Sequence, residues 1–216
     1  YLQSLSSMVP PLVLNPKKGE KVLDLTAAPG SKTTQMACFM ENEGYILANE
    51  LDKIRCERLQ YNVKSQGAEI VEVINGRGEK IGNSYPEYFD KVLLDTPCSG
   101  EGRFLLGKPM TYKDWSLKKV NQLVKIQKKL FESAYNATKE NGTIVYSTCT
   151  INKEENEYIL DWAINTFNIK LLDINLDIKE AIKGDNTGLN NTIDKAIKIL
   201  PSKNMEGFFV AKIVKN

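Results

Sequence analysis

Two cysteines in this 216-residue sequence stand where side chains could do chemistry. Cys98 lies in the segment 95–102 (DTPCSGEG), and Cys149 lies in the segment 146–150 (YSTCT). Each segment follows a short apolar run that predicts a buried strand, so each thiol is expected in a loop at a strand end. If the two strands are neighbours, both thiols and the carboxylate of Asp95 face one cleft.

Two thiols and a carboxylate suit the methylation of a pyrimidine at carbon 5. That carbon is a poor nucleophile, but a thiolate added to carbon 6 gives an enamine-like ring, which can attack an electrophilic methyl group on a sulfonium. A second group must then help to remove the carbon-5 proton, so that the thiolate is expelled. Asp95 suits a hydrogen bond to the pyrimidine edge, which favours protonation of ring nitrogen 3. A polar loop, a nearby helix N-terminus and the cationic sulfonium would favour the thiolate.

The composition excludes several other chemistries. The sequence has no histidine, which excludes Ser-His-Asp catalysis, Cys-His catalysis and histidine-ligated metals. Its four cysteines form no CxxC pair and no regular spacing, so reduced thiols are expected, with no metal site and no disulfide framework. Cys38 and Cys56 fall inside predicted helices and are expected to be inert packing residues.

The length and the charge fit one soluble domain. A chain of 216 residues with 42% hydrophobic residues can form one globular domain over residues 1–216. Apolar runs are short and broken by charge, and no basic-then-apolar leader is present, so we expect a soluble, cytoplasmic monomer without a membrane segment. A net charge of +2 and a pI of about 8.2 permit nucleic-acid binding without indicating it.

Apolar runs alternate with amphipathic stretches, which predicts an α/β fold. Strands are predicted at 21–25, 45–49, 70–74, 89–94 and 143–147, with two further strand-like runs at 197–200 and 207–213. Helices are predicted after the turn AAPGS through Met40, at 52–65, at 116–139 with Asn141-Gly142 as its cap, and at 154–167. This order predicts a doubly wound, mostly parallel sheet with an antiparallel edge hairpin, whose ligands lie beyond the carboxyl ends of the strands.

A turn of small residues follows the first predicted strand and opens a helix. It consists of Thr26, Ala27, Ala28, Pro29, Gly30, Ser31 and Lys32. Its backbone N–H groups could approach a ligand at the helix N-terminus. The turn matches neither the phosphate-binding pattern G-x-x-x-x-G-K-[ST] nor the nicotinamide pattern G-x-G-x-x-G.

A nucleoside cofactor fits the order of elements better. Glu50 ends the second predicted strand, where a carboxylate can accept both hydroxyl protons of a ribose and repel a 2′-phosphate. A neighbour of a helix N-cap is the alternative role for Glu50. Asn75 follows the third predicted strand and could contact an adenine, although an Asn-Gly pair also forms turns.

Seven segments together span essentially the whole chain and carry a family resemblance. They are YLQSLSSMVP, DLTAAPGSKTTQMA, ANELDKIRCERLQYNV, NGRGEKIG, FDKVLLDTPCSGEG, NGTIVYSTCTINKEENE and GFFVAKI. These segments closely resemble the Sun/NSUN family of RNA cytosine-5 methyltransferases, and the paired D-x-P-C-S-G-E-G and Y-S-T-C-T motifs are the most specific of them. The resemblance implies a Rossmann-like class I methyltransferase fold with S-adenosylmethionine as the cofactor.

The resemblance also implies residue roles. Cys149 would form the covalent bond to cytosine and Cys98 would assist release, which reverses the order in DNA cytosine-5 methyltransferases. Residues 26–32, Glu50 and Asp95 match cofactor-contacting positions, and Asp95 also matches a base-contacting aspartate. The implied substrate is structured RNA with a flipped-out cytosine, with ribosomal RNA as the first expectation and transfer RNA as the second.

Three departures from the family pattern stand out. Thr26 replaces a frequent Cys, and Asn75 replaces the usual Asp before Gly-Arg. The N-terminal RNA-binding segment of the family does not precede the YLQ stretch, and the C-terminal one of many members does not follow the core. Either the sequence is a trimmed catalytic core or another molecule supplies RNA docking, and we expect trimming because Tyr1 falls inside a motif.

Basic residues near the strand ends could hold RNA phosphates, although a solvated surface charge is the more common role for each one taken alone. They are Arg77, Lys80, Arg103, Lys108 and Lys113. Two other functions stay open: a non-catalytic RNA-binding or ribosome-assembly protein that keeps the fold, and a methyltransferase for a small molecule or protein. The second has no need of paired cysteines.

Overall fold

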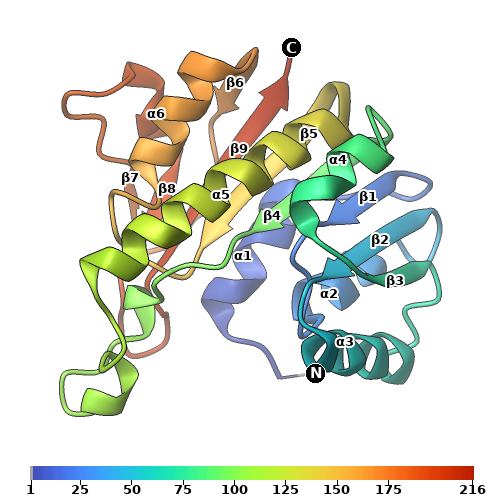
Figure 1. The fold of residues 1–216 in the computed structure, drawn as a ribbon, viewed down its shortest axis with the longest axis horizontal. Coiled ribbons are helices and arrows are strands. Elements are labelled where there is room, and N and C mark those ends of the chain that lie inside the picture. The colour runs from blue at the N-terminus through green and yellow to red at the C-terminus, as the bar shows by residue number, and fades with distance from the viewer. Residues whose placement is uncertain (1) are drawn as a thin grey trace.

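Nine strands form one sheet in the computed structural model, which describes residues 2–216 (Figure 1). They are β1 (Lys21–Asp24), β2 (Tyr45–Glu50), β3 (Val71–Asn75), β4 (Phe89–Asp95), β5 (Thr138–Thr148), β6 (Ile169–Leu172), β7 (Ala181–Lys183), β8 (Ile197–Ile199) and β9 (Phe208–Lys215). Their order is β3-β2-β1-β4-β5-β9-β8-β7, and β6 also pairs with β9. Tyr1, the first residue of the YLQ motif, lies outside the described residues.

The sheet has a parallel half and an antiparallel edge. Strands β3, β2, β1, β4 and β5 run parallel, whereas β9 is antiparallel to β5, β6 and β8. The predicted doubly wound α/β fold with a mostly parallel sheet and an antiparallel edge is confirmed. The antiparallel edge is larger than the predicted hairpin, because β6 and β7 have only four and three residues and show no usable periodicity.

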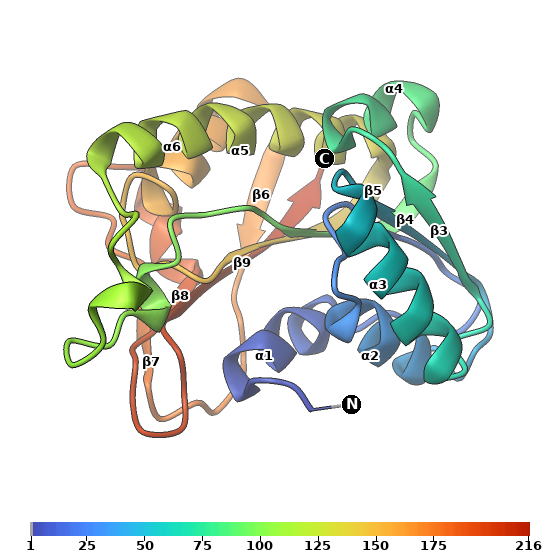
Figure 2. The same ribbon diagram turned by 60° about the horizontal axis from the view of Figure 1, so that its bottom comes forward.

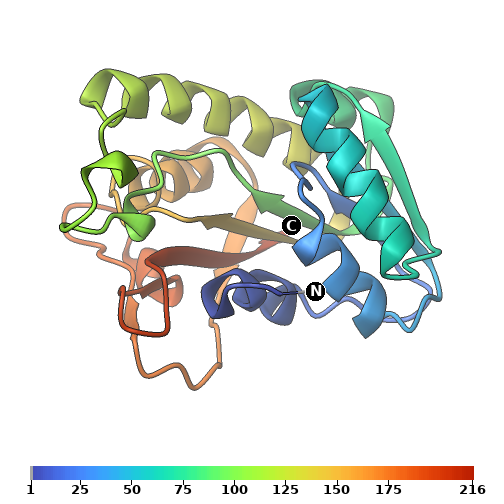
Figure 3. The ribbon, with the colours of Figure 1, turned by 90° about the horizontal axis from the view of Figure 1, so that it is seen from below.

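Helices cover both faces of the sheet. They are α1 (Leu5–Leu14), α2 (Ser31–Phe39), α3 (Lys53–Ser65), α4 (Ile81–Ser84), α5 (Leu117–Ala137) and α6 (Glu157–Thr166). Figures 2 and 3 show α5 and α6 on one face, and α1 and α2 on the opposite face. Among the helices of residues 2–216, none combines the length and the apolar character needed to cross a bilayer.

Two clusters of buried side chains hold these layers together. Phe131 of α5 packs with Tyr146 of β5 in the cluster below α5 and α6. Val13 of α1 and Met36 of α2 belong to the cluster on the other face. Since both faces of the parallel strands are covered, their carboxyl ends are fixed relative to one another, and the loops that follow them form a defined site.

Helix α1 was not predicted from the sequence. It contains Pro10 and Pro11, which normally argue against a helix interior. Its apolar side chains Val9, Val13 and Leu14 are buried against the sheet and the neighbouring helix, so tertiary packing outweighs the local propensity.

The predicted cap at Asn141-Gly142 is wrong. Helix α5 ends at Ala137, and Thr138 already begins β5. Asn141 has a φ of 61°, and the pairing of β4 with β5 shifts register between Thr138 and Thr143. A Cβ at position 142 would lie 2.6 Å from the Thr138 methyl group, so glycine is required inside this irregular stretch of strand.

Candidate active site

A cavity of about 680 Å³ opens at the carboxyl ends of the parallel strands, within the size range of small-molecule sites. Ten of the residues singled out from the sequence line it: Thr26, Ala28, Pro29, Ser31, Lys32, Glu50, Asp95, Cys98, Arg103 and Cys149. Ala27 and Gly30 lie buried in the same turn without lining the cavity. The strand order therefore brings the turn, the carboxylates and both thiols to one place, as the sequence predicted.

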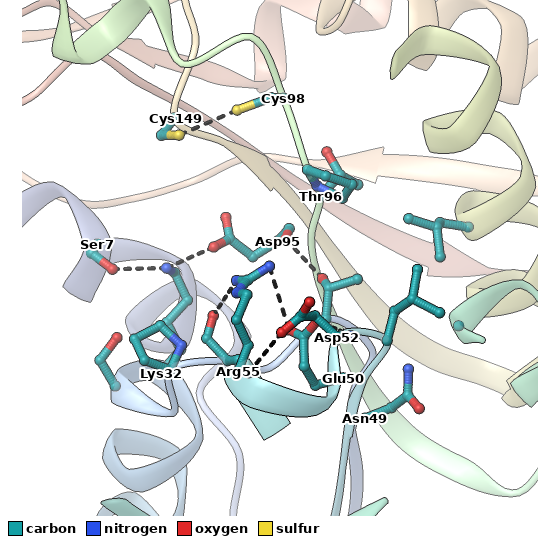
Figure 4. A pocket seen from close by; sticks show the side chains of 18 of the residues that line it. Ser7, Lys32, Asn49, Glu50, Asp52, Arg55, Asp95, Thr96, Cys98 and Cys149 are labelled. Carbon is teal, nitrogen blue, oxygen red and sulfur yellow. Dashed lines mark hydrogen bonds and ion pairs between the residues drawn. The ribbon is translucent and has the colours of Figure 1, made fainter. Parts of the chain in front are cut away.

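The two thiols are in direct contact. Cys98 Sγ and Cys149 Sγ lie 3.2 Å apart, and both side chains are half-buried (Figure 4). The contact follows from the pairing of β4 with β5, in which Asp95 stands opposite Ser147. The backbone N–H of Gly102 donates to the carbonyl of Cys149 at 3.1 Å, which further ties the two loops together.

The two thiols differ in acidity. The pKa of Cys98 is raised well above its usual range, first because its thiol donates a hydrogen bond to the Cys149 sulfur and then because it is buried. The pKa of Cys149 is lowered, first because its sulfur accepts that bond and then, against the effect of burial, because Arg103 and Lys32 are positively charged. Cys149 is therefore the more acidic thiol of the pair. The sequence predicts a phosphate contact for Arg103 and does not indicate its effect on this thiol.

Asp95 is held at the cavity from two sides. One carboxylate oxygen accepts from the Ser147 hydroxyl at 2.7 Å, and the other pairs with Lys32 Nζ at 2.7 Å. The Thr26 hydroxyl donates to the Asp95 carbonyl at 2.7 Å. Lys32 also donates to the hydroxyl of Ser7 on α1 at 2.7 Å, as Figure 4 shows. Lys32 therefore fixes and neutralises Asp95, and it also links Asp95 to α1, a helix that the sequence did not predict.

Glu50 ends β2 with its carboxylate at the cavity wall. One oxygen accepts from the backbone N–H of Asp52 at 2.9 Å, and the other lies 3.6 Å from a guanidinium nitrogen of Arg55. Since a carboxylate offers about four acceptor positions, it keeps capacity for a ligand. Asp52 is the N-cap of α3. Glu50 is therefore both a neighbour of a helix N-cap and a group that lines the cavity.

Asn75 ends β3, and its side chain contacts the end of β2. It is exposed, and its amide donates to the carbonyls of Glu50 at 2.7 Å and of Leu51 at 2.9 Å. Within the described chain it is not one of the cavity-lining residues, whereas Asn49 and Gly78 are. Asn75 therefore braces the end of β2, which leaves its predicted adenine contact without support from the geometry.

The other two cysteines lie outside the cavity. Cys56 is buried in α3, as expected, and burial raises the pKa of its thiol. Cys38 was expected to pack, and that is wrong: it is exposed on α2. The buried side of this short helix is occupied by Thr33, Met36 and Ala37, which leaves position 38 facing solvent.

Asp24 lies behind the turn and titrates far from its usual range. Its side chain is only 1% exposed and accepts from the Thr33 hydroxyl at 2.7 Å. Burial, opposed by that hydrogen bond, raises its pKa from 3.8 to about 7. The folded protein therefore binds this proton more tightly than the unfolded chain does, and the stabilisation is lost as the pH rises from about 4 to about 7.

Asp24→Asn is expected to remove this pH dependence. One pKa unit corresponds to about 1.4 kcal/mol, so the variant should be more stable than the native protein at pH 8 by up to about 4 kcal/mol and equally stable near pH 4. Urea unfolding at both pH values measures the effect. Asp177→Asn, at an exposed aspartate, is the matched control. Parallel pH profiles for the native protein and Asp24→Asn would contradict the burial argument.

The strand order and the cavity at the carboxyl ends define a Rossmann-like methyltransferase fold. The chain belongs to the 16S rRNA methyltransferase RsmB/F family, whose model matches residues 11–214.

Curated and structural relatives agree with this assignment. The chain is 40% identical to a tRNA (cytosine(49)-C(5))-methyltransferase from Pyrococcus abyssi, over 99% of this chain and 69% of the relative. It is 39% identical to the ribosomal RNA small subunit methyltransferase F of Escherichia coli, over 100% of this chain and 44% of the relative. The crystal structure of NSun6 from Pyrococcus horikoshii with SFG, an analogue of S-adenosylmethionine, matches with a TM-score of 0.86 and 32% identity, over 100% of this chain and 53% of that one. The chain thus spans about half to two thirds of the length of these relatives.

Proposed function

We propose that this protein transfers a methyl group from S-adenosylmethionine to carbon 5 of a cytosine in RNA. The observation that carries the proposal is the pair of thiols of unequal acidity, 3.2 Å apart, in a cavity that also contains Asp95 and Glu50. The names of the two curated relatives, one acting on transfer RNA and one on ribosomal RNA, support the same reaction. S-adenosylmethionine supplies an electrophilic methyl group when it is bound.

The residues around the cavity fit this cofactor. Glu50 would accept the ribose hydroxyls, because its carboxylate is at the wall and keeps free acceptor positions. Thr26, Ala28 and Ser31 have small side chains, so the main chain of the turn can approach a ligand. The SFG-bound relative of the same fold supports this assignment.

Cys149 would act as the nucleophile. Its thiolate adds to carbon 6 of the cytosine, and the electron pair of the ring double bond moves towards carbon 5 and the N3 edge. Asp95 would hold that edge, since Lys32 and Ser147 fix the orientation of its carboxylate. Nitrogen 3 would take up a proton from solvent as charge develops, donate it in a hydrogen bond to Asp95 that stabilises the adduct, and return it to solvent when Cys149 leaves.

Cys98 would act in the release step. Once Cys149 is bonded to carbon 6, the hydrogen bond that most strongly raised the pKa of Cys98 has lost its anionic acceptor, and Cys98 can give up its proton. The Cys98 thiolate then removes the proton from methylated carbon 5, and the bond between Cys149 and carbon 6 breaks. The departing Cys149 thiolate accepts a hydrogen bond from the re-formed Cys98 thiol, so the resting pair is restored and one proton is released overall.

The RNA would approach the open side of the cavity with the target cytosine out of its stack. Arg103 is exposed and also lines the cavity, so it is the best placed of the five basic residues to meet a neighbouring phosphate. Lys108 and Lys113 follow it as exposed residues. We propose residues 1–216 as one catalytic domain, with ribosomal RNA as the first candidate substrate and transfer RNA as the second.

Trapping on 5-azacytidine-containing RNA tests the reaction. The aza ring has nitrogen at position 5 and no proton there to remove, so the protein should stay covalently attached to small-subunit ribosomal RNA or transfer RNA transcripts in the presence of S-adenosylmethionine. The adduct is measured as a shifted band on a denaturing gel, with unsubstituted transcripts as the control. Lack of any adduct, together with lack of cofactor binding by calorimetry, would favour a non-catalytic RNA-binding protein. Bisulfite sequencing then identifies which RNA is methylated.

A further inference from the structure

A buried carboxylate lies behind the loop that carries Cys98. Glu155 lies two residues before the start of α6, next to the N-cap Asn156, and is fully buried. Its oxygens accept the backbone N–H of Ser99 at 3.0 Å, the side-chain amide of Gln127 at 2.9 Å, and the Ser99 hydroxyl. In the described structure, every hydrogen bond to this carboxylate thus comes from the residue after Cys98 or from Gln127 on α5.

Gln127 also holds the loop that carries Cys98. The same amide nitrogen that reaches Glu155 also donates to the carbonyl of Pro97 at 3.0 Å. The peptide groups on both sides of Cys98 are therefore held, one through Pro97 and the other through Ser99. Gln127 is also fully buried. Gln127 and Glu155 therefore interact away from solvent, where hydrogen bonds to a charged acceptor are strong.

The same hydrogen-bond network reaches the loop that carries Cys149. The hydroxyls of Ser99 and Thr150 lie 3.0 Å apart. Because the Ser99 hydroxyl proton is directed to the Glu155 carboxylate, the Ser99 oxygen must accept the proton of Thr150. Thr150 follows Cys149 directly, so the orientation of Glu155 bears on the separation of the two sulfurs.

Burying the carboxylate of Glu155 costs desolvation free energy that an apolar side chain would not incur. Burial raises the pKa of Glu155, and the hydrogen bonds from Ser99 and Gln127 counteract that effect. An apolar side chain of similar size could fill the same space but could not hold the N–H and the hydroxyl of Ser99 together.

We propose that Glu155, together with Gln127, is a positioning residue that holds Cys98 in place for the release step. This inference rests on the proposed function. It assigns to Glu155 an effect on one half of the reaction: covalent attachment through Cys149 proceeds, whereas removal of the carbon-5 proton by a displaced Cys98 is slow. The expected signature is an accumulated protein–RNA adduct, the same signature that loss of Cys98 itself should give.

Single-turnover reactions of two variants with unsubstituted RNA test the inference. Glu155→Gln keeps the shape and removes the charge, and Gln127→Leu removes the bond to Pro97 at similar volume. In both, adduct formation measured on the high-pH plateau of attachment should stay within about twofold of the native rate, while release should slow by roughly tenfold or more, as expected when a hydrogen bond to a charged group is lost. Glu154→Gln, at the exposed neighbouring glutamate, is the matched control and should behave as the native protein does.

Thermal unfolding and calorimetry with S-adenosylmethionine show which variants are folded and bind the cofactor. If folded Glu155→Gln and Gln127→Leu lose attachment and release in parallel, or lose neither, the positioning role is overturned. Cys98→Ala separates the two proposals: adduct in Cys98→Ala but not in these variants refutes only the role of Glu155. No adduct in Cys98→Ala refutes the release mechanism itself.

Discussion

Cys149→Ala is expected to abolish methyl transfer while leaving cofactor binding intact. In the proposed reaction Cys149, whose pKa is lowered, is the group that bonds to the pyrimidine, and Cys98 acts only in release. Turnover should fall by roughly 10⁴-fold or more, the scale typical of a lost covalent nucleophile. Measurements are methyl incorporation into RNA, adduct formation on 5-azacytidine RNA, and calorimetry with S-adenosylmethionine.

Cys38→Ala is the matched control for that experiment. It removes one exposed thiol outside the cavity and should leave both incorporation and trapping unchanged. If Cys149→Ala still forms the adduct, or still turns over at a measurable fraction of the native rate, then Cys149 is not the nucleophile.

Cys98→Ala is expected to attach to RNA and then stall. Without the second thiol, the carbon-5 proton has no nearby base, so the covalent adduct should accumulate on ordinary cytosine RNA and turnover should fall by roughly 10²-fold or more, the usual scale of a lost general base. The adduct should be visible on a denaturing gel without any cytosine analogue. A variant with normal turnover would refute the division of roles between the two cysteines.

The same substitution should also change the pH dependence of attachment. The hydrogen bond from Cys98 is the largest cause of the lowered pKa of Cys149, so its loss raises that pKa and moves the attachment profile to higher pH. Cys98→Ser separates the two effects, because a hydroxyl can donate the hydrogen bond but is a poor base. Attachment by Cys98→Ser should follow a profile close to the native one, and its adduct should still accumulate.

Much of the site could be predicted because its groups stand at strand ends. Each parallel strand is a short apolar run, and the residue that follows it must lie at one edge of the sheet. That rule predicts from the sequence that Glu50, Asp95, Cys98 and Cys149 lie together, and all four line the cavity. To place these four residues together, it was enough to predict the parallel strands from their apolar runs and to expect them to be neighbours in the sheet.

Contacts between distant segments could not be predicted in the same way. Lys32 pairs with Asp95 and also donates to Ser7 of α1, a helix that its two prolines argued against in the sequence. The bonds of Glu155 join residues 28 and 56 positions apart, and nothing in the local pattern indicates them. The exposure of Cys38 depends on which side of a weakly amphipathic helix meets the sheet.

The irregular start of β5 has a consequence for how the chain can vary. From Lys91 opposite Thr143 to Asp95 opposite Ser147, the pairing of β4 with β5 advances without interruption, and the shift in register is confined to the end remote from the thiols. A slip of one residue in the uninterrupted part would reverse the facing of every side chain there and would separate the two sulfurs. Insertions and deletions between Lys139 and Gly142 should therefore have little effect on methyl transfer. A single residue added between Lys91 and Asp95 should instead separate the catalytic groups and abolish methyl transfer.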